Sequence, residues 1–107
     1  SKEAGETMLR ALKRNYRDGE ALSFLPPRVN TFSKNGAVNK SRSETILVNA
    51  PHGDFVFSII TKNQKDESWQ KHNEGWDLAR KLALIIWQHY EPKSKWKPME
   101  KETEKWF

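Results

Sequence analysis

SETILVNAPHGDFVFSIITKN, residues 43–63, decides the fold, because it holds two runs rich in β-branched and aromatic side chains. Runs of this composition, here at 44–50 and 54–62, favour β-strands. The proline, histidine and glycine between them are typical of a turn, with Gly53 at a position that favours positive φ. The stretch therefore predicts an antiparallel β-hairpin.

A weaker strand is predicted upstream of this hairpin, at residues 28–34. The Asn35-Gly36 pair that follows is a common turn signal. The polar run that continues to Ser43 predicts a loop much longer than a tight turn. The sequence therefore predicts three strands, with a long loop between the first strand and the hairpin.

Helices are predicted on both sides of the strands. Residues 4–17 place apolar side chains on one face of an amphipathic helix. Residues 73–92 form a stronger pattern with a wide apolar face, with Asn73 as a candidate N-cap and Pro92 as its end. The predicted fold class is α/β (α+β): a small antiparallel sheet of about three strands with N- and C-terminal helices packed on it.

The predicted elements divide the chain into two parts. Residues 1–92 are expected to form one folded unit, and residues 93–107 a charged extension whose aromatic side chains anchor it to something. Three strands and two helices leave one face or one edge of the sheet uncovered. The wide apolar face of the last helix agrees, so we expect the chain to be part of a larger protein or a partner in an oligomer.

Composition limits the function classes. The 107 residues carry a net charge of +5, and none of them is cysteine, so disulfides and thiolate metal sites are excluded. The positive charge permits binding to nucleic acid, but lysine and glutamate are mixed along the chain without a basic stripe. No apolar run approaches the roughly 20 residues of a membrane span. The three histidines lack metal-ligand spacing, so we expect no metal and no cofactor.

One combination of motifs points to a family. Lys34-Asn35-Gly36 at the end of a predicted strand, a following loop with Arg42, the hairpin and the C-terminal helix together resemble the C-terminal part of class A β-lactamases and related penicillin-interacting serine hydrolases. In that family a K-[TS]-G motif lies on a strand that lines the active-site cleft. The resemblance runs from about residue 5 to residue 91 and covers only the final part of a whole enzyme.

The resemblance implies roles for five residues. The Lys34 ammonium would attract the substrate carboxylate and the developing oxyanion. Gly36 would let the substrate lie against the strand edge, and the backbone N–H of Ala37 would donate to the oxyanion. Arg42 would bind the substrate carboxylate with its planar fork, the alternative being an exposed loop arginine without such a role. Asn35 stands where the family has Thr or Ser. It can still donate to a carboxylate, but its size and shape put efficient β-lactam turnover in question.

The family nucleophile is not found in the expected order. The family's S-x-x-K and S-D-N motifs precede K-T-G, whereas the two S-x-x-K strings here, at 68–71 and 94–97, follow Lys34, and S-D-N does not occur. Both strings lie in polar segments, while the chemistry needs a serine at the start of a buried helix. The chain alone is therefore expected to be inactive.

Two functions remain open at this point. The first is a C-terminal fragment of a β-lactamase-like serine hydrolase, which performs acyl transfer on a β-lactam or related amide or ester with a serine from an N-terminal portion. The resemblance then implies a bacterial, periplasmic or secreted enzyme linked to antibiotic resistance, with that N-terminal portion or a second copy as partner and no nucleic acid. The alternative is a small basic α/β module that binds nucleic acid or a protein through its uncovered sheet face, without catalysis. In that case Asn35-Gly36 would be a turn at the end of a strand, without a catalytic role.

Overall fold

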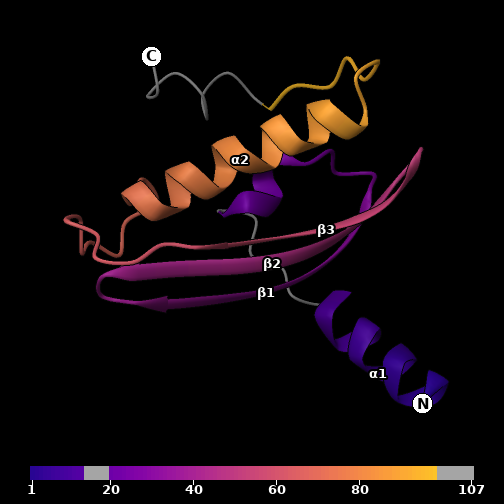
Figure 1. Cartoon of the computed structure of the whole chain (residues 1–107), viewed down its shortest axis with the longest axis horizontal. Coiled ribbons are helices and arrows are strands. Elements are labelled where there is room, and N and C mark those ends of the chain that lie inside the picture. Colours follow the sequence, from indigo (N-terminus) through magenta and orange to yellow (C-terminus); the bar gives the residue numbers. More distant parts are fainter. Residues whose placement is uncertain (14–19, 99–107) are drawn as a thin grey trace.

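The strands and helices follow the predicted order. The computed structural model describes residues 1–13 and 20–98, which form a three-stranded antiparallel sheet with helices around it (Figure 1). The elements are α1 (Lys2–Lys13), the short 3-10 helix η1 (Ala21–Phe24), β1 (Asn30–Val38), β2 (Ser41–Ala50), β3 (Gly53–Ile60) and α2 (Glu74–Tyr90). The sheet order is β1-β2-β3. The predicted α+β fold class is confirmed.

The β2–β3 hairpin agrees with the prediction. Ala50 pairs with Gly53, so Pro51 and His52 form a two-residue turn. Gly53 has a φ of 136°, a conformation that side chains rarely adopt, which confirms the glycine requirement at this position. The β-branched and aromatic side chains of both runs therefore lie in paired strands as expected.

The long loop predicted between the first two strands is wrong. Asn35 and Gly36 lie inside β1, where they pair with Glu44 and Ser43, and the chain turns over the two residues between Val38 and Ser41. An Asn-Gly turn needs positive φ, and in the described part of the chain only Gly53 and Asn63 have it. The polar run belongs to two strands because several of its side chains find polar partners on folding, so polarity did not mark a loop.

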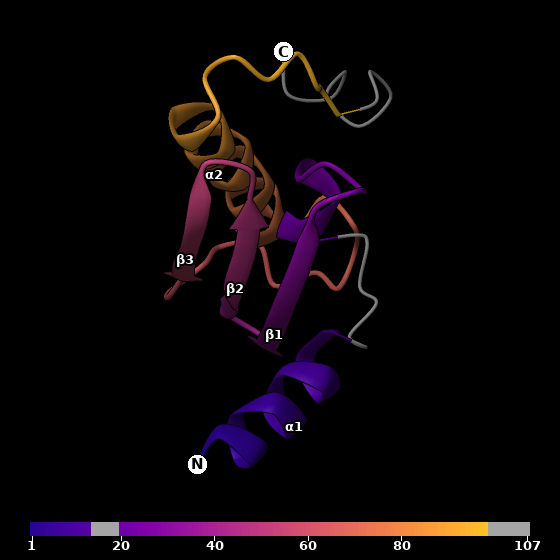
Figure 2. The ribbon, with the colours of Figure 1, turned by 90° about the vertical axis from the view of Figure 1, so that its right-hand side faces the viewer.

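The sheet has one covered face and one open face. We call the face under α2 the inner face and the opposite face the outer face; α2 and η1 lie on the inner side, and α1 lies on the outer side beside β1 (Figures 1 and 2). Ile46, Val48 and Phe55 of the inner face pack with Ala83 and Trp87 of α2 in the hydrophobic core. The core therefore lies in a single layer between sheet and helix.

The two long helices differ in how firmly they are held. The Asn73 side chain accepts a hydrogen bond from Gly75 N, which confirms it as the N-cap of α2. α2 ends at Tyr90, ahead of Pro92, close to the predicted boundary. α1 has no buried residue, and its Met8 side chain is exposed, so the predicted apolar face of this helix is not packed into the core.

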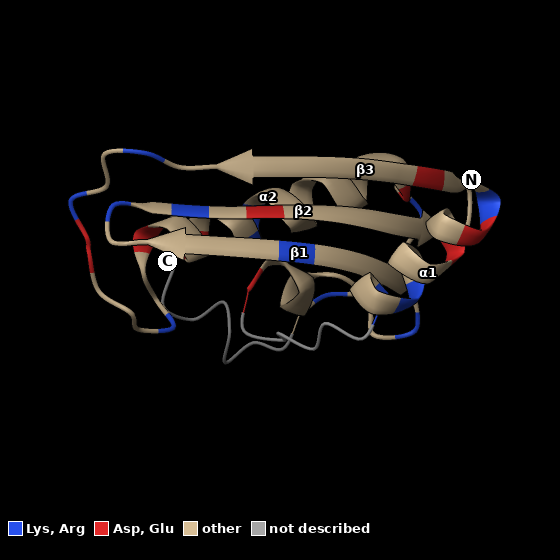
Figure 3. Cartoon of the chain, turned by 90° about the horizontal axis from the view of Figure 1, so that it is seen from below, with Lys and Arg blue, Asp and Glu red and all other residues tan. Residues whose placement is uncertain are grey.

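The outer face and the free edge of β3 carry exposed apolar side chains. Val38, Val56 and Ile60 are all exposed, Ile60 by 76%. β3 pairs with β2 alone among the described residues, and the outer face is seen directly in Figure 3. This confirms the prediction that part of the sheet is uncovered.

The C-terminal extension is described only in part. Trp96 is half-buried and Pro98 is buried. Met99, Trp106 and Phe107, which were also predicted to anchor the tail, lie outside the described residues, as does Tyr16 of the predicted first helix. Among the described residues, no helix combines the length and the apolar character needed to cross a membrane.

Candidate functional site

Four of the five predicted site residues lie side by side on β1. We call this stretch, residues 34–37, the β1 wall. β1 is an edge strand that pairs only with β2 in the described part of the chain, so alternate backbone N–H and C=O groups face away from the sheet. By strand alternation Lys34 and Gly36 belong to the outer face, and Asn35 and Ala37 to the inner face.

Lys34 keeps its charge at the surface. Its side chain is exposed, and Nζ donates a hydrogen bond to the backbone oxygen of Asn35 at 2.5 Å. Lys34 pairs across the strands with Thr45, whose hydroxyl lies 2.7 Å from that of Ser58. The ammonium is therefore held against the backbone of the wall itself, and the cross-strand neighbour of Lys34 on the outer face is a neutral hydroxyl residue.

Gly36 is needed for space rather than for backbone conformation. A Cβ at this position would lie 2.8 Å from Oγ of Ser43, which pairs with Gly36 across the strands and donates to its carbonyl oxygen at 3.4 Å. Real Cβ atoms essentially never come so close. The glycine thus keeps the outer surface of the wall flat at this point.

Asn35 is half-buried, and its side chain points inward. Its amide Nδ2 donates to Oε1 of Glu20 at 3.2 Å. Directly across the strands lies Glu44, whose Oε2 accepts from the backbone N of Ala21 at 3.1 Å. Two carboxyl groups therefore lie beneath the wall, both buried: Glu20 is 8% exposed and Glu44 is 2% exposed.

The Glu44 carboxyl has an unusual proton affinity. Burial raises the pKa of Glu44 from 4.5 to about 7. The hydrogen bond from Ala21 and the charge of Arg80 lower this pKa, whereas the nearby charge of Glu20 raises it. At neutral pH the Glu44 carboxyl is therefore protonated in a substantial fraction of the molecules.

Sequence reasoning missed this acidic pair. Glu44 occupies the strand position two residues before Ile46, which is buried, so the two-residue period of a strand puts it on the same buried face. That alternation was the available signal. Glu20 offered none, because it lies just before η1 and reaches Asn35 only through the tertiary fold.

Arg42 is almost completely buried, with 1% of its surface exposed. Nη1 donates to the backbone oxygens of Val38 and Ser41, and Nη2 donates to that of Ser68 at 2.6 Å. The guanidinium carbon lies 4.6 Å from the centre of the Trp69 ring, a cation–π contact. Arg42 therefore fastens the β1–β2 turn to the loop after β3.

These contacts bear on the two interpretations of Arg42. The exposed-loop alternative is wrong, because the side chain is buried. Its contact with a substrate carboxylate stays a prediction, but the fork is already bound to backbone carbonyls. Arg42 is therefore not among the residues of the β1 wall.

Neither S-x-x-K string offers a nucleophile at the start of a helix. Ser68 lies in the irregular segment before α2, where its carbonyl oxygen accepts hydrogen bonds from Arg42 and Asn73. Ser94 follows α2 in another irregular, exposed segment. The rejection of both serines is confirmed in this respect.

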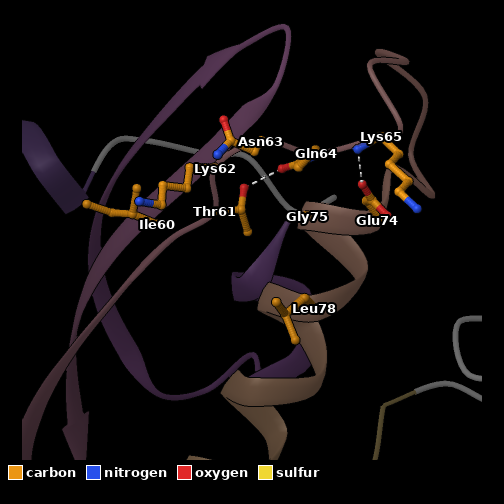
Figure 4. A pocket seen from close by; sticks show the side chains of 9 residues that line it. All are labelled: Ile60, Thr61, Lys62, Asn63, Gln64, Lys65, Glu74, Gly75 and Leu78. Atoms are coloured by element: carbon orange, nitrogen blue, oxygen red, sulfur yellow. Dashed lines mark hydrogen bonds between the residues drawn. The ribbon is translucent and has the colours of Figure 1, made fainter.

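A groove lies at the opposite edge of the sheet from the β1 wall, beside the free edge of β3 (Figure 4). It has a volume of about 600 Å³ and runs between the end of β3 and the first turns of α2. Exposed Ile60 and Leu78 flank it, and the Glu74 carboxylate accepts from the backbone N of Lys65 at 2.8 Å. A second groove of about 390 Å³, lined in part by Val56 and Ile85, lies farther along the same edge.

The geometry and the comparisons define one class of protein. The family model described as β-lactamase enzyme family matches residues 1–90, so the chain belongs to that family. No curated protein matches.

Solved structures show the same fold. The β-lactamase of Sphaerobacter thermophilus superposes with a TM-score of 0.72 at 18% identity over 86% of this chain. PBP-A, a variant of which was solved as an acyl-enzyme complex with penicillin G, gives 0.71 at 15% identity over 86%. A class A β-lactamase of Mycobacterium abscessus gives 0.66 at 15% over 84%. The chain spans only 33%, 34% and 34% of PBP-A and the Sphaerobacter and Mycobacterium proteins, respectively.

Proposed function

We propose that this chain is the C-terminal portion of a β-lactamase-like serine hydrolase and that its β1 wall lines the substrate cleft. The observation that carries the proposal is that Lys34, Asn35, Gly36 and Ala37 lie on an edge strand of the sheet that the described residues form, in a member of this family. Residues 1–92 form the domain portion, and residues 93–107 a C-terminal extension.

The chemistry is acyl transfer in two steps. A serine from the N-terminal portion attacks the carbonyl carbon of a β-lactam or related amide or ester, and the C–N or C–O bond breaks to give an acyl-enzyme. The serine proton passes to the leaving nitrogen or oxygen, which stays tethered to the acyl group after opening of a β-lactam ring and departs as the amine or alcohol from an open-chain substrate. Water then attacks the ester, releases the acid and restores the serine. The 107-residue chain supplies the binding surface for these steps and no nucleophile.

Each wall residue has a role that suits its position. The exposed Lys34 ammonium supplies positive potential to a substrate carboxylate and to the oxyanion. Gly36 leaves space for the substrate backbone to approach the strand edge. The backbone N–H of Ala37 donates to the oxyanion, and Asn35 lies between them as the substituted middle residue.

The uncovered surfaces support an N-terminal portion as the partner. The open outer face and the β3 edge expose Val38, Val56 and Ile60, and unpaired apolar strand edges in natural proteins are normally covered or blunted. Because β-lactamase homologues are typically exported, we propose a periplasmic or secreted protein. PBP-A forms a penicillin G acyl-enzyme as a variant, which supports a β-lactam or related substrate.

The nucleic-acid alternative finds no support in the charge distribution. On the outer face of the described sheet, strand alternation places the charged residues Lys34 and Asp54, which have opposite signs (Figure 3). A nucleic-acid surface needs clustered basic side chains. The charge distribution therefore favours the hydrolase over the nucleic-acid module.

Labelling with a fluorescent penicillin, read on a denaturing gel, tests the proposal. The protein encoded by the complete gene should be labelled, and the 107-residue chain should not. Lys34→Ala should slow labelling by about 100-fold, as loss of an oxyanion or carboxylate contact does in other enzymes. Lys40→Ala, in the exposed β1–β2 turn, is the matched control and should label normally. Because rapid hydrolysis of the acyl-enzyme would remove the label, consumption of the penicillin is measured alongside, and a complete protein that is neither labelled nor able to hydrolyse it would overturn the proposed chemistry.

A further inference from the structure

Three segments far apart in the sequence meet beneath the β1 wall. Asn35 donates from its amide to Glu20, which lies 15 residues earlier and just before η1. Glu44 of β2 accepts from Ala21 N, 23 residues earlier. Because Asn35 and Glu44 are direct cross-strand partners, the two carboxyl groups link η1 to both strands at the level of the wall.

The two carboxyl groups of this cluster are buried among apolar side chains. Glu44 shares the inner face with the fully buried Ile46, and Ala21 and Phe24 of η1 are fully buried beside it. Burying a carboxyl costs free energy unless hydrogen bonds and charges compensate. A hydrophobic pair of similar volume often serves stability equally well, so the polar cluster points to a need for a directional contact at Asn35.

We propose that Glu20 is a positioning residue for the β1 wall, acting through the side-chain amide of Asn35. The positioning role for substrate binding rests on the function proposed above. In this arrangement the side chain of Asn35, the middle residue of Lys34-Asn35-Gly36, contacts the protein and not the substrate. Glu20 holds its amide on the inner face of the sheet, and this contact holds β1 in the orientation that turns Lys34 outward.

The same contact accounts for the departure from the family pattern. The family's Thr or Ser has a hydroxyl on a short side chain, whereas Asn35 extends an amide that donates to a buried carboxylate. An amide donor and the Glu20 acceptor form a matched pair. The asparagine at position 35 is therefore coupled to Glu20. Restoring Thr or Ser at position 35 would also require a change at Glu20.

Hydrogen exchange measured by mass spectrometry on the protein encoded by the complete gene tests the proposal. In Glu20→Ala, peptides covering β1 should exchange about tenfold faster or more, as expected for the loss of one hydrogen bond to a charged group. Peptides covering β3 should exchange at their original rate. Glu20→Gln keeps an oxygen acceptor and should restore most of the protection.

Asn35→Ala supplies a second route to the same answer. It removes the donor and should reproduce the effect on β1, and the double variant with Glu20→Ala should add little beyond either single change. Glu67→Gln, on an exposed loop residue, is the control. Unchanged exchange of β1 in both single variants, or equal acceleration of β1 and β3, would overturn the positioning role.

Penicillin labelling separates this proposal from the proposed function. If the wild-type protein is labelled, Glu20→Ala should label more slowly, and Glu20→Gln should recover most of the rate. If the wild-type protein is neither labelled nor able to hydrolyse the penicillin, the hydrolase proposal fails, and the exchange experiment still decides whether Glu20 holds β1 through Asn35.

Discussion

Asn35 and Glu20 are joined by a hydrogen bond of 3.2 Å from side-chain amide to carboxylate, so the middle residue of the wall motif points into the protein. The two flanking residues behave differently: Lys34 is exposed, and Gly36 lies close against Ser43. The β1 wall is thus one strand with two functions on its two faces. In the roles proposed above, the inner face fixes the strand through Asn35, and the outer face carries the exposed Lys34 side chain toward a ligand.

Stability should depend on pH through Glu44. Its pKa is raised from 4.5 to about 7 in the folded protein. Between these two pH values the folded protein therefore keeps a proton on Glu44 that the unfolded chain has released. The free energy of unfolding should therefore fall as pH rises through this window, by up to roughly 3 kcal/mol, and this loss is complete above it. Glu20 and Arg80 are the charged groups that act on Glu44.

Urea unfolding of the wild type and Glu44→Gln at a series of pH values measures this effect. Glu44→Gln has no carboxyl to titrate, so its curve should be flatter between the two pKa values. Two parallel curves would show that Glu44 does not carry a raised pKa.

Removing the Arg42 side chain should destabilise the fold strongly. Arg42→Ala deletes the guanidinium donors to the carbonyl oxygens of Val38 and Ser41 and one of the two side-chain donors to that of Ser68, all in partly buried hydrogen bonds. We expect a loss of about 3 kcal/mol or more in the free energy of unfolding. Arg42→Lys keeps the charge but not the planar fork, and it should fall between the wild type and Arg42→Ala.

Denaturant unfolding followed by tryptophan fluorescence checks the role of Arg42. Lys40→Ala in the same turn is exposed and should change stability by less than about 0.5 kcal/mol. Similar midpoints for Arg42→Ala and Lys40→Ala would contradict the structural role given to Arg42.

Two glycine substitutions should act in opposite directions. A Cβ on Gly75 would lie 2.9 Å from Cγ of Arg42 and would also run into Oε1 of Gln64. Gly75→Ala should therefore destabilise by about 1–3 kcal/mol through overpacking. A Cβ on Gly5 would meet nothing within 4 Å, and Gly5→Ala should favour α1 by up to about 1 kcal/mol. Thermal unfolding and helical circular dichroism of both variants test the pair, and loss of stability in Gly5→Ala would refute the contrast.

The isolated chain should self-associate through its uncovered strand. Val56 and Ile60 are exposed by 61% and 76% on β3, whose outer edge is free among the described residues. Ile60→Lys and Val56→Lys should shift sedimentation profiles toward monomer, because lysine on an edge strand opposes pairing. Gln88→Lys adds the same charge at an exposed position of α2 and should have little effect. A stable monomer at high concentration in the unmodified chain would count against the need for a partner.

Much of the fold was predictable because its signals are local. The hairpin over 44–62 follows from composition and a turn glycine, and α2 follows from its apolar period and the Asn73 cap. The β1–β2 connection was not predictable in this way. Arg42 and Glu44 are polar residues that belong to strands, because their partners lie 26 and 23 residues away, at Ser68 and Ala21.

The candidate site was predictable only as a set of positions. The motif around Lys34 predicted which residues belong to the candidate site, and the strand register places them together on β1. The direction of each side chain depends on strand alternation, which the wrongly predicted loop concealed. The acidic pair beneath the wall depends on η1 folding back onto the sheet, and no local pattern carries that information.

The sheet is a meander, in which each strand pairs with its neighbour in sequence through a two-residue turn. Such pairings close short loops and give low contact order, which favours rapid folding. We expect the three strands to assemble early, with α2 docking onto them afterwards. For the hydrolase proposed above, a strand scaffold that forms from its own contacts would allow reconstitution with an N-terminal portion produced as a separate polypeptide. Acylation by penicillin would then report the joining of the two pieces.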